Sequence, residues 1–488
     1  MADKVVKLSC NSVIRRYVTA TVAAPAIPKC DFTPKQYTGP SYHKTEQVKS
    51  QHLPPAVFNI YKKPLLLHQG RMQWLYDHEG NRYLDLFGGI VTVSVGHCHP
   101  KVVGALQDQI NTLWHCTNIY RHPKIYEYVE QLVSKFPGDL KVVYLVNSGT
   151  EANDLATLLA KAYTGNLDVV SLQSSYHGYS SAVMGLTATQ SYRMKVPVPP
   201  GFYHTMLPDP YRGIFGGCRD SLSQAPGACA CPGDCVSSDK YVHQLNELLE
   251  NSIPKGRLAA LFAESIQGVN GTVQFPKGYL KKAHQLVKKY GGLYVADEVQ
   301  TGFGRTGDAF WGFENHEVVP DIVTMAKGIG NGFPMAAVVT TKEIAAAHTG
   351  STYFNTFGGN PMAGAVGKAV LDVIEEEELQ KNCKEIGKYF IEQLMQLQKI
   401  HPVIGDVRGK GLMLGFEYVV PGTKEPLDVA DVNGIHEDMK DMGVLIGRGG
   451  RWNNVMRIKP PMCINKEDVD FAVSVIDQAI KNYTNNKK

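Results

Sequence analysis

Two stretches decide the fold of this chain: Leu293-Tyr294-Val295-Ala296-Asp297-Glu298, and Thr324-Met325-Ala326-Lys327-Gly328-Ile329-Gly330-Asn331-Gly332. Each is an apolar run, typical of a buried strand, that ends at a charged residue. Among apolar and glycine neighbours, Lys327 does not fit a solvated surface charge. One explanation is that its amine is used covalently, as an imine to an aldehyde cofactor, while Asp297 holds a proton on the ring nitrogen of that cofactor. The pair predicts pyridoxal phosphate chemistry.

Further short apolar runs alternate with helical stretches from about residue 100 onward. The expected strands are residues 141–146, 168–172, 259–263, 292–297, 322–325 and 336–340, and helices are expected at 101–113 and 126–136. Strands that alternate with helices imply a mostly parallel sheet covered on both faces. The sequence therefore predicts an α/β fold, with a large domain over residues 100–370 that binds the cofactor.

The two ends of the chain are expected to form a smaller α+β domain, because 488 residues exceed one usual core. Residues 31–99 contribute an extended arm over 31–55 and a hairpin around the turn at 78–81. Residues 371–488 contribute a long helix at 375–399, a strand at 411–417, and a helix at 466–483 that Asn465 caps.

Composition limits the classes of partner. Hydrophobic residues make up 43% of the chain and charged residues 20%, as in ordinary soluble proteins, and the net charge is +4. No basic run is interleaved with aromatic residues, so nucleic acid is not expected as a partner. No stretch of about 18 apolar residues occurs, so no membrane partner is expected.

The first 30 residues resemble a mitochondrial transit peptide. Five basic residues are set against the single acid Asp3, with Ser, Thr and Ala between them: Lys4, Lys7, Arg15, Arg16 and Lys29. We therefore expect residues 1–30 to be a targeting segment and the protein to be located in the mitochondrial matrix.

A phosphate-binding turn is indicated after the strand that ends at Val146. Ser148 and Glu151 have the spacing of a capping box, and a helical face of apolar residues follows. Gly149 lets the backbone approach a ligand closely, and the amides at the start of a helix attract phosphate. An ordinary strand-to-helix turn is an equally open interpretation of this stretch alone.

Residues 302–307 form a literal G-x-G-x-x-G after a strand, so a nucleotide-binding oxidoreductase is an alternative. The aromatic and glycine-rich stretch 308–313 does not open a good helix, and no acid ends a strand about 20 residues later. A loop beside the cofactor is the favoured interpretation.

Three side chains near strand ends are candidates for ligand contacts. Tyr176 can stack on a flat ring, although it can equally anchor a loop. Arg408 precedes an apolar strand and can bind a substrate carboxylate through two hydrogen bonds, the alternative being a surface ion pair. Glu264 ends another strand and is expected to be the counter-ion of Arg408 when no carboxylate is bound.

Ten cysteines are too few for a disulfide scaffold and suit a reducing compartment. Four of them gather in a loop rich in Pro and Gly: Cys218, Cys229, Cys231 and Cys235. They can bind zinc or form a disulfide. Because their spacing matches no paired Cys-x-x-Cys site, a surface insertion without metal is favoured.

With these residues assembled, the chain resembles the class III (omega-type) pyridoxal-phosphate aminotransferases over roughly residues 50–485. The motifs that carry the resemblance are residues 148–153, 296–302 and 326–328, in the order and spacing of the family. The resemblance implies the fold-type I architecture of pyridoxal-phosphate enzymes. It also implies a homodimer or homotetramer with the active site at the subunit interface.

The resemblance also implies roles for individual residues. Lys327 would bind the cofactor covalently and Asp297 would pair with its ring nitrogen. The other cofactor contacts would be Gly149 and Thr150 at the phosphate, Tyr176 and Val299 on the two ring faces, Gln300 near the ring hydroxyl, and Thr356 from the partner chain. The substrate contacts would be Arg408 with Glu264 and, more weakly, Tyr61.

The implied activity moves an amino group from alanine, a β-amino acid or a methylated arginine to glyoxylate or pyruvate. Ile90 and Val269 stand where ornithine aminotransferases carry a tyrosine and a glutamate. Both changes make the pocket less polar and disfavour a long diamine substrate. The alternative within the family is a class III lyase or aminomutase that acts on a related amine.

Overall fold

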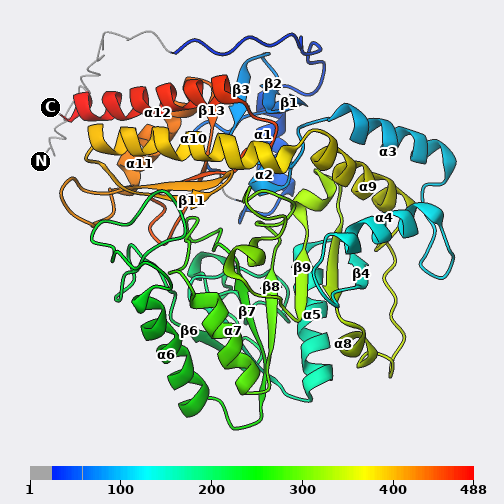
Figure 1. Ribbon diagram of the computed structural model, residues 1–488. Helices are drawn as coiled ribbons and strands as arrows, with labels where there is room; N and C mark the ends of the chain where they lie inside the picture. Colours follow the sequence, from blue (N-terminus) through cyan, green and yellow to red (C-terminus); the bar gives the residue numbers. More distant parts are fainter. Residues whose placement is uncertain (1–24, 58, 488) are drawn as a thin grey trace, which may run out of the picture.

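The computed structural model describes residues 25–57 and 59–487. Residues 1–24 of the predicted targeting segment therefore lie outside the described residues. A seven-stranded sheet dominates the larger part of the molecule (Figure 1), in the order β4-β10-β9-β8-β7-β5-β6. Its strands are β4 (Val142–Val146), β5 (Asp168–Leu172), β6 (Phe202–Thr205), β7 (Leu258–Glu264), β8 (Leu293–Asp297), β9 (Ile322–Met325) and β10 (Ala336–Thr340).

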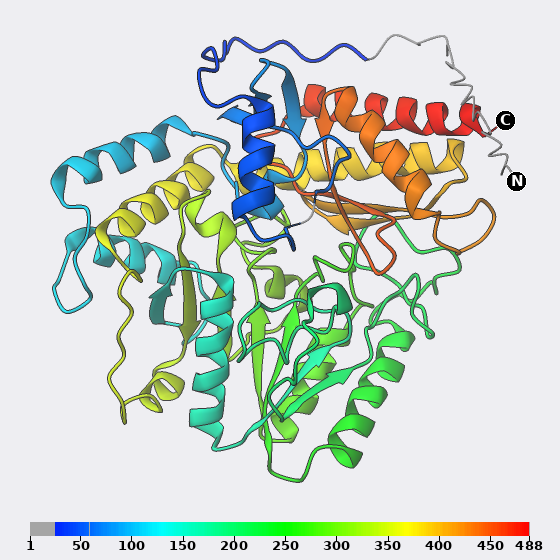
Figure 2. The same ribbon diagram turned by 180° about the vertical axis from the view of Figure 1, so that it is seen from behind.

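This large sheet is mixed but mostly parallel. β10 runs antiparallel to both β4 and β9. The five strands β9, β8, β7, β5 and β6 run parallel to one another. Helices α6 (Val236–Asn251) and α7 (Tyr279–Lys289) cover one face, and α5 (Gly149–Thr164) covers the other (Figures 1 and 2). The predicted α/β class is confirmed, and the carboxyl ends of β7, β8 and β9 meet at one edge.

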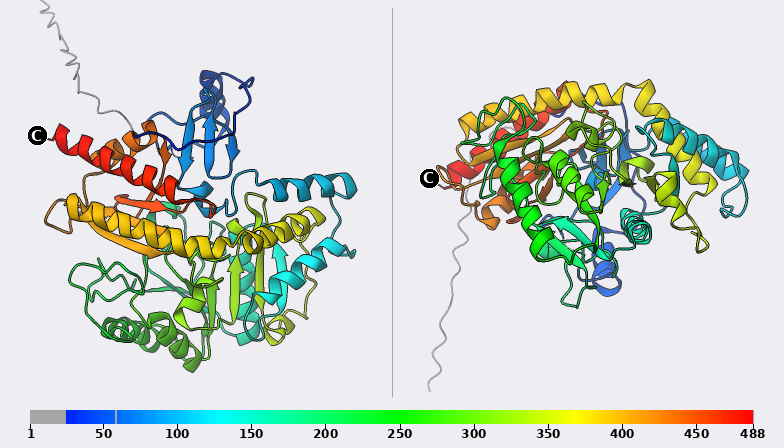
Figure 3. Two further views of the ribbon diagram at one scale, coloured as in Figure 1. Left: turned by 45° about the horizontal axis from the view of Figure 1, so that its top comes forward. Right: turned by 60° about the horizontal axis from the view of Figure 1, so that its bottom comes forward.

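Two smaller sheets lie outside the large one, and the first of them combines the two ends of the chain. One contains β1 (Leu67–Arg71), β2 (Trp74–Asp77), β3 (Arg82–Asp85) and β13 (Val444–Leu445), and β13 runs parallel to β3. The other contains β11 (Ile404–Lys410), β12 (Met413–Tyr418), β15 (Val455–Ile458) and β14 (Gly447–Gly449). Helices α10 (Leu379–Ile400), α11 (Val429–Asp441) and α12 (Lys466–Asn486) pack beside these sheets (Figure 3).

Helices α3 (Pro100–Thr112), α4 (Pro123–Ser134) and α9 (Pro361–Glu376) pack together beside the β4 edge. The other short helices are α2 (Gly88–Val91) and α8 (Lys342–Ala346). Among the described residues, no helix combines the length and the apolar character needed to cross a membrane.

The structure corrects the expected elements at three places. The stretch 31–55 is not wholly extended, because it contains α1 (Tyr42–His52), whose start is capped by Ser41 Oγ at 3.2 Å from the Lys44 amide. Strand β6 was not expected. The long helix predicted at 375–399 is broken before α10, where Glu378 adopts a left-handed φ of 49°.

The close approach of α9 to α4 depends on a glycine. A Cβ added at Gly364 would lie 2.7 Å from the carbonyl oxygen of Lys124, a backbone atom that cannot move independently. At Gly434 in α11, by contrast, an added Cβ would meet no atom within 4 Å. Substitution of Gly434 therefore tests helix propensity alone, whereas substitution of Gly364 also tests the packing of two helices.

We predict that Gly364→Ala lowers the free energy of unfolding by about 1–3 kcal/mol, because the clash outweighs the better helix propensity of alanine. Gly434→Ala should raise it by about 0.5–1 kcal/mol. Urea unfolding followed by circular dichroism measures both. A stabilising Gly364→Ala would show that the two helices can move apart without cost.

Candidate active site

Three charged side chains meet at the carboxyl edge of the large sheet. Glu264 is the last residue of β7, Asp297 is the last residue of β8, and Lys327 follows β9 in a short 3-10 turn. The two acids lie opposite each other in the register of β7 and β8. Lys327 has a left-handed φ of 54°, a conformation that non-glycine residues adopt mainly at functional sites. Ligands bind at this edge in open α/β sheets.

A cavity of about 140 Å³ opens at this edge. Twelve residues line it: Gly149, Thr150, Asn153, Tyr176, His177, Gly178, Glu264, Asp297, Val299, Gln300, Ala326 and Lys327. The structure thus brings together every cofactor contact expected from the sequence except Thr356. It also adds two residues that the sequence analysis did not single out, Asn153 and His177.

One end of the cavity is the start of α5. Ser148 Oγ accepts from the Glu151 amide at 3.2 Å, and the Glu151 carboxylate accepts from the Ser148 amide at 3.1 Å. This capping box fixes the first turn. A Cβ at Gly149 would lie 3.2 Å from Val299 Cγ2 and would narrow the cavity. The helix start is therefore open to a group as compact and negative as phosphate.

Asp297 is buried and held from three sides. Its carboxylate accepts from His177 Nδ1 at 2.8 Å, from Asn153 Nδ2 at 2.9 Å and from the Val299 amide at 3.1 Å. Burial would raise the pKa of Asp297, but the hydrogen bonds and charge of His177 and the bond from Asn153 lower it below the ordinary value. Asp297 is therefore an anion fixed in position, able to hold a proton on a ring nitrogen.

The amine of Lys327 is poised near neutrality. Burial lowers its pKa to about 8, against the opposing influence of Asp297 and Glu264. Burial also raises the pKa of Glu264 to about 7, together with repulsion from Asp297. Glu264 Oε2 accepts from the Gly268 amide at 2.9 Å, whereas its Oε1 is buried without a partner.

Arg408 does not pair with Glu264 as the sequence analysis expected. Its guanidinium is buried in β11, with Nη1 2.7 Å from Asp406 and 2.8 Å from Glu417. Burial alone would lower its pKa, but Glu417 and Asp406 raise it above the ordinary value. Two carboxylates already satisfy Arg408, and it does not line the Lys327 cavity.

Another arginine, which the sequence analysis missed, acts electrostatically on Lys327 and Glu264, although it too lies outside the set of residues that line the cavity. Arg457 in β15 is buried, its Nε has no partner, and no described carboxylate forms an ion pair with it. Burial lowers the pKa of Arg457, and the charge of Glu264 partly opposes this. Burial is the largest cause of the lowered pKa of Lys327, and the positive charge of Arg457 lowers that pKa further. The available signal was a charged residue within the apolar run Val455-Met456-Arg457-Ile458.

Two other expected contacts lie outside the cavity. Tyr61 stacks on His436, with ring centroids 4.6 Å apart. Thr356 is exposed at the surface beside Phe357, whose exposed fraction is 64%. Neither residue therefore contacts the Lys327 cavity within a single chain.

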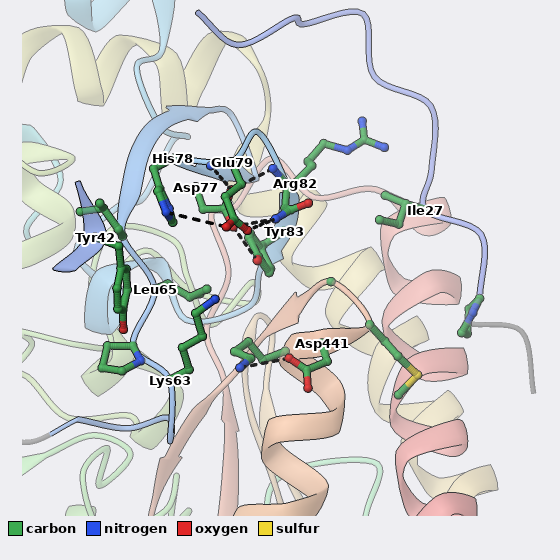
Figure 4. Close-up of a pocket in the computed structure, with 17 residues that line it drawn as sticks. Ile27, Tyr42, Lys63, Leu65, Asp77, His78, Glu79, Arg82, Tyr83 and Asp441 are labelled. Carbon is green, nitrogen blue, oxygen red and sulfur yellow. Dashed lines mark hydrogen bonds and ion pairs between the residues drawn. The ribbon is translucent and has the colours of Figure 1, made fainter. Parts of the chain in front are cut away.

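A larger cavity, of about 420 Å³, lies beside the hairpin of β2 and β3 (Figure 4). Its central carboxylate, Asp77, is already engaged by the amides of Glu79 and Asn81, each at 2.9 Å, and by the Tyr83 hydroxyl at 2.9 Å. These bonds close the turn of the hairpin, so Asp77 has a structural role there.

Comparison with known proteins identifies the family of this chain. The model of the family described as aminotransferase class-III matches residues 59–480. The chain belongs to the class III aminotransferases. It is 52% identical over 461 residues to human mitochondrial alanine–glyoxylate aminotransferase 2, which covers 93% of this chain and 90% of the relative.

Solved structures agree with the family. A phospholyase from Arthrobacter in complex with phosphoethanolamine is 31% identical, with a TM-score of 0.81 over 90% of this chain and 99% of that one. A PLP-bound amine transaminase from an uncultivated Pseudomonas species is 27% identical, with a TM-score of 0.78 over 93% and 99% of the two chains. The fold is that of the fold-type I pyridoxal-phosphate enzymes, and this class III aminotransferase is a mitochondrial, pyridoxal-phosphate-dependent enzyme.

The cavity fits pyridoxal phosphate on its own chemistry. It offers an amine for the aldehyde, a fixed carboxylate for the ring nitrogen and a helix start for the phosphate. Buried polar atoms without a partner remain around it, namely Asn153 Oδ1, His177 Nε2 and Glu264 Oε1. The alternative of a nucleotide site at residues 302–307 is wrong, because that turn leads into the 3-10 turn Gly312–His316 and not into a helix start that could hold a pyrophosphate.

The lowered pKa of Lys327 predicts how the apoenzyme takes up its cofactor. Only the neutral amine attacks an aldehyde, so the rate of covalent uptake should rise with pH through a midpoint of about 8. Visible absorbance of the bound cofactor, followed by stopped flow, measures that rate. A midpoint near the ordinary lysine value of about 10.4 would contradict the environment described here.

Proposed function

We propose that this aminotransferase moves the amino group of alanine, a β-amino acid or a methylated arginine to glyoxylate or pyruvate. The observation that carries the proposal is Arg457, a buried guanidinium without a carboxylate partner beside Glu264 and Lys327. Such a group is a site for the carboxylate that all of these donors and acceptors share. The name of the human relative supports alanine as donor and glyoxylate as acceptor.

Pyridoxal phosphate, when bound, supplies the electron sink that stabilises negative charge at the substrate α carbon. Lys327 would anchor the cofactor, and once the substrate amine has displaced it, its neutral Nζ would take the proton from the substrate carbon that bears the amine. Asp297 keeps the ring nitrogen protonated, because its lowered pKa leaves it anionic. His177 and Asn153 hold that carboxylate in register.

The remaining cavity residues position the cofactor. Gly149 and Thr150 bind the phosphate at the start of α5, and Tyr176 and Val299 enclose the ring. Gln300 faces the ring hydroxyl. Its Oε1 accepts from Lys459 Nζ at 2.8 Å, which fixes the orientation of the amide.

Arg457 and Glu264 together set the selectivity for substrates. A substrate carboxylate pairs with Arg457, while Glu264, whose pKa burial raises to about 7, can take up a proton near neutral pH and thereby reduce its repulsion of the substrate. Between turnovers, ionised Glu264 offsets the charge of Arg457. Tyr61 is a weaker substrate contact, because it lies outside the cavity formed by one chain.

A second copy of the chain completes the site. The exposed Thr356 contacts the cofactor phosphate of the partner, as expected for a homodimer or homotetramer. Large apolar side chains with high exposed fractions support a contact in this region: Trp114 at 63%, Phe354 at 55% and Phe357 at 64%. Single exposed apolar residues are ordinary, but His115 and Phe357 also pack together, with ring centroids 5.8 Å apart. The matrix is the compartment in which this assembly works.

The second candidate is a class III lyase that eliminates a group from a related amine. The 31% identity to the Arthrobacter phospholyase favours it, because the same covalent lysine can serve both reactions. The two functions differ in their products. Transamination converts the donor to an oxo acid (2-oxo from an α-amino acid, 3-oxo from a β-amino acid) and the acceptor to its amine, whereas elimination releases phosphate or an alkene without an acceptor.

We predict that Lys327→Ala abolishes transamination and the visible absorbance of the covalently bound cofactor, while far-ultraviolet circular dichroism stays unchanged. The exposed Lys342→Ala is the matched control and should keep both properties. The wild type is assayed with alanine, 3-aminoisobutyrate and a methylated arginine against glyoxylate and pyruvate, and with phosphoethanolamine in the absence of an acceptor. Phosphate released from phosphoethanolamine without an acceptor, or an alkene formed without an oxo acid, would decide for the lyase.

Arg457→Ala should lower kcat/KM for alanine in the donor half-reaction by about 100-fold, because it removes a buried partner of the carboxylate. A donor without a carboxylate, 1-phenylethylamine, should change only a few-fold, and the exposed Arg451→Ala should affect neither donor. Single-turnover kinetics without acceptor measure the half-reaction. Equal losses for both donors would show that Arg457 acts on the fold instead.

A further inference from the structure

The segment between β6 and α6, residues 206–235, contains no helix or strand. Loops of this length inside a compact domain are uncommon unless something supports them. Part of that support is ionic. Arg219 is fully buried and donates to both carboxylate oxygens of Asp406 in β11, at 2.9 and 2.6 Å. The loop therefore connects the large sheet to the sheet of the smaller lobe.

The same loop brings four sulfurs together. Cys218 Sγ lies 2.8 Å from Cys229 Sγ, which lies 3.1 Å from Cys235 Sγ and 3.2 Å from Cys231 Sγ. All four sulfurs lie within 4.8 Å of one another. Cys218 and Cys235 are buried, and the other two close the cluster on the solvent side.

This arrangement has the dimensions of a tetrahedral metal site. Zinc binds thiolate sulfur at about 2.3 Å, so four sulfurs around one ion are separated by about 3.8 Å. The sulfur–sulfur separations, from 2.8 Å to no more than 4.8 Å, lie on both sides of that value, so that each needs to change by about 1 Å at most. Four soft ligands without a fifth polar side chain select zinc over magnesium or calcium.

We propose that Cys218, Cys229, Cys231 and Cys235 bind one Zn²⁺ as a closed structural site. Four thiols each lose a proton and form four zinc–sulfur bonds, so one ion replaces four protons and the centre carries two negative charges. No redox step is involved. With four protein ligands the ion has no open position for a substrate, so the site fixes the loop and takes no part in transamination.

The backbone around the cluster is built to hold thiolates. The Cys218 amide donates to Cys235 Sγ at 3.2 Å, a bond that favours the ionised sulfur. The two buried cysteines are also tied through Lys277, whose carbonyl accepts from the Cys235 amide at 3.0 Å and whose amide donates to the Cys218 carbonyl at 3.1 Å. Cys235 is the N-cap of the sixteen-residue helix α6, where the helix dipole stabilises negative charge.

The zinc would act on the rest of the molecule through the ion pairs of the loop. Cys218 is adjacent to Arg219, whose partner Asp406 also accepts from Arg408 at 2.7 Å. Fixing Cys218 fixes the backbone from which Arg219 reaches into this buried cluster. The role follows from the structure: an ion that closes the loop holds the two lobes in register at β11.

A disulfide is the competing state of the same sulfurs, because Cys218 and Cys229 already lie in contact. The two states differ in the number of thiols and in the metal content. With zinc, all ten cysteines of the chain are reduced. With one or two disulfides within the cluster, two or four thiols are lost.

The experiment uses the full-length holoenzyme without an affinity tag, produced with Zn²⁺ in the medium and dialysed extensively. Mass spectrometry of the metals should find about one zinc per chain, and zinc K-edge absorption should fit four sulfurs at about 2.3 Å. Alkylation in denaturant with a chelator, but without reductant, should modify all ten cysteines. A chain without zinc, zinc with nitrogen or oxygen ligands, or missing thiols would overturn the proposal.

Variants locate the ion. Cys231→Ser should reduce bound zinc at least about tenfold, because it removes one ligand on the accessible side of the cluster. Cys98→Ser, at an exposed cysteine outside the cluster, is the matched control and should keep the zinc. Unchanged zinc in folded Cys231→Ser would refute the site. If that variant does not fold, the metal content and thiol count of the wild type still decide.

Discussion

The buried carboxylate of Asp297 is the constraint around which the site is arranged. An ionised acid at 3% exposure is costly unless hydrogen bonds replace water, and His177, Asn153 and the Val299 amide do so. Each donor comes from a different element: the turn after β5, helix α5 and the backbone beyond β8. Asp297 stays charged only if the three elements that carry its donors keep their relative positions. The cavity that lies between these elements is therefore fixed in shape.

The same burial gives the neighbouring groups their chemistry. It lowers the pKa of Lys327 to about 8 and raises that of Glu264 to about 7, so both groups are close to a change of charge at physiological pH. A pocket of this polarity favours groups that bring their own charge. The helix start at Gly149, the anionic Asp297 and the amine of Lys327 line this pocket together.

The smaller lobe contributes cations, and its internal ion pairs decide which cation is available. Arg408 and Arg457 lie on two strands of one sheet, β11 and β15, which are separated by β12. Asp406 and Glu417 both form ion pairs with Arg408, whereas no described carboxylate forms an ion pair with Arg457. Loop 206–235 strengthens this division, because Arg219 and Arg212 add their charges to the same two acids.

The sequence by itself determined the order of strands and helices, the capping box at Ser148, and the pairing of Lys327 with Asp297. Local patterns specify these features, since apolar periodicity, caps and glycine turns act over a few residues. It did not determine α1, which a short polar stretch hides, or which arginine is free of carboxylate partners. Arg408 and Arg457 both stand in strands and look alike in sequence. Only the tertiary structure decided between them, because the carboxylates that neutralise one and leave the other free come from side chains brought together by sheet pairing.

The four sulfurs of Cys218, Cys229, Cys231 and Cys235 follow the same rule. Their spacing matched no known pattern, and only the fold of the loop brought them within reach of one ion.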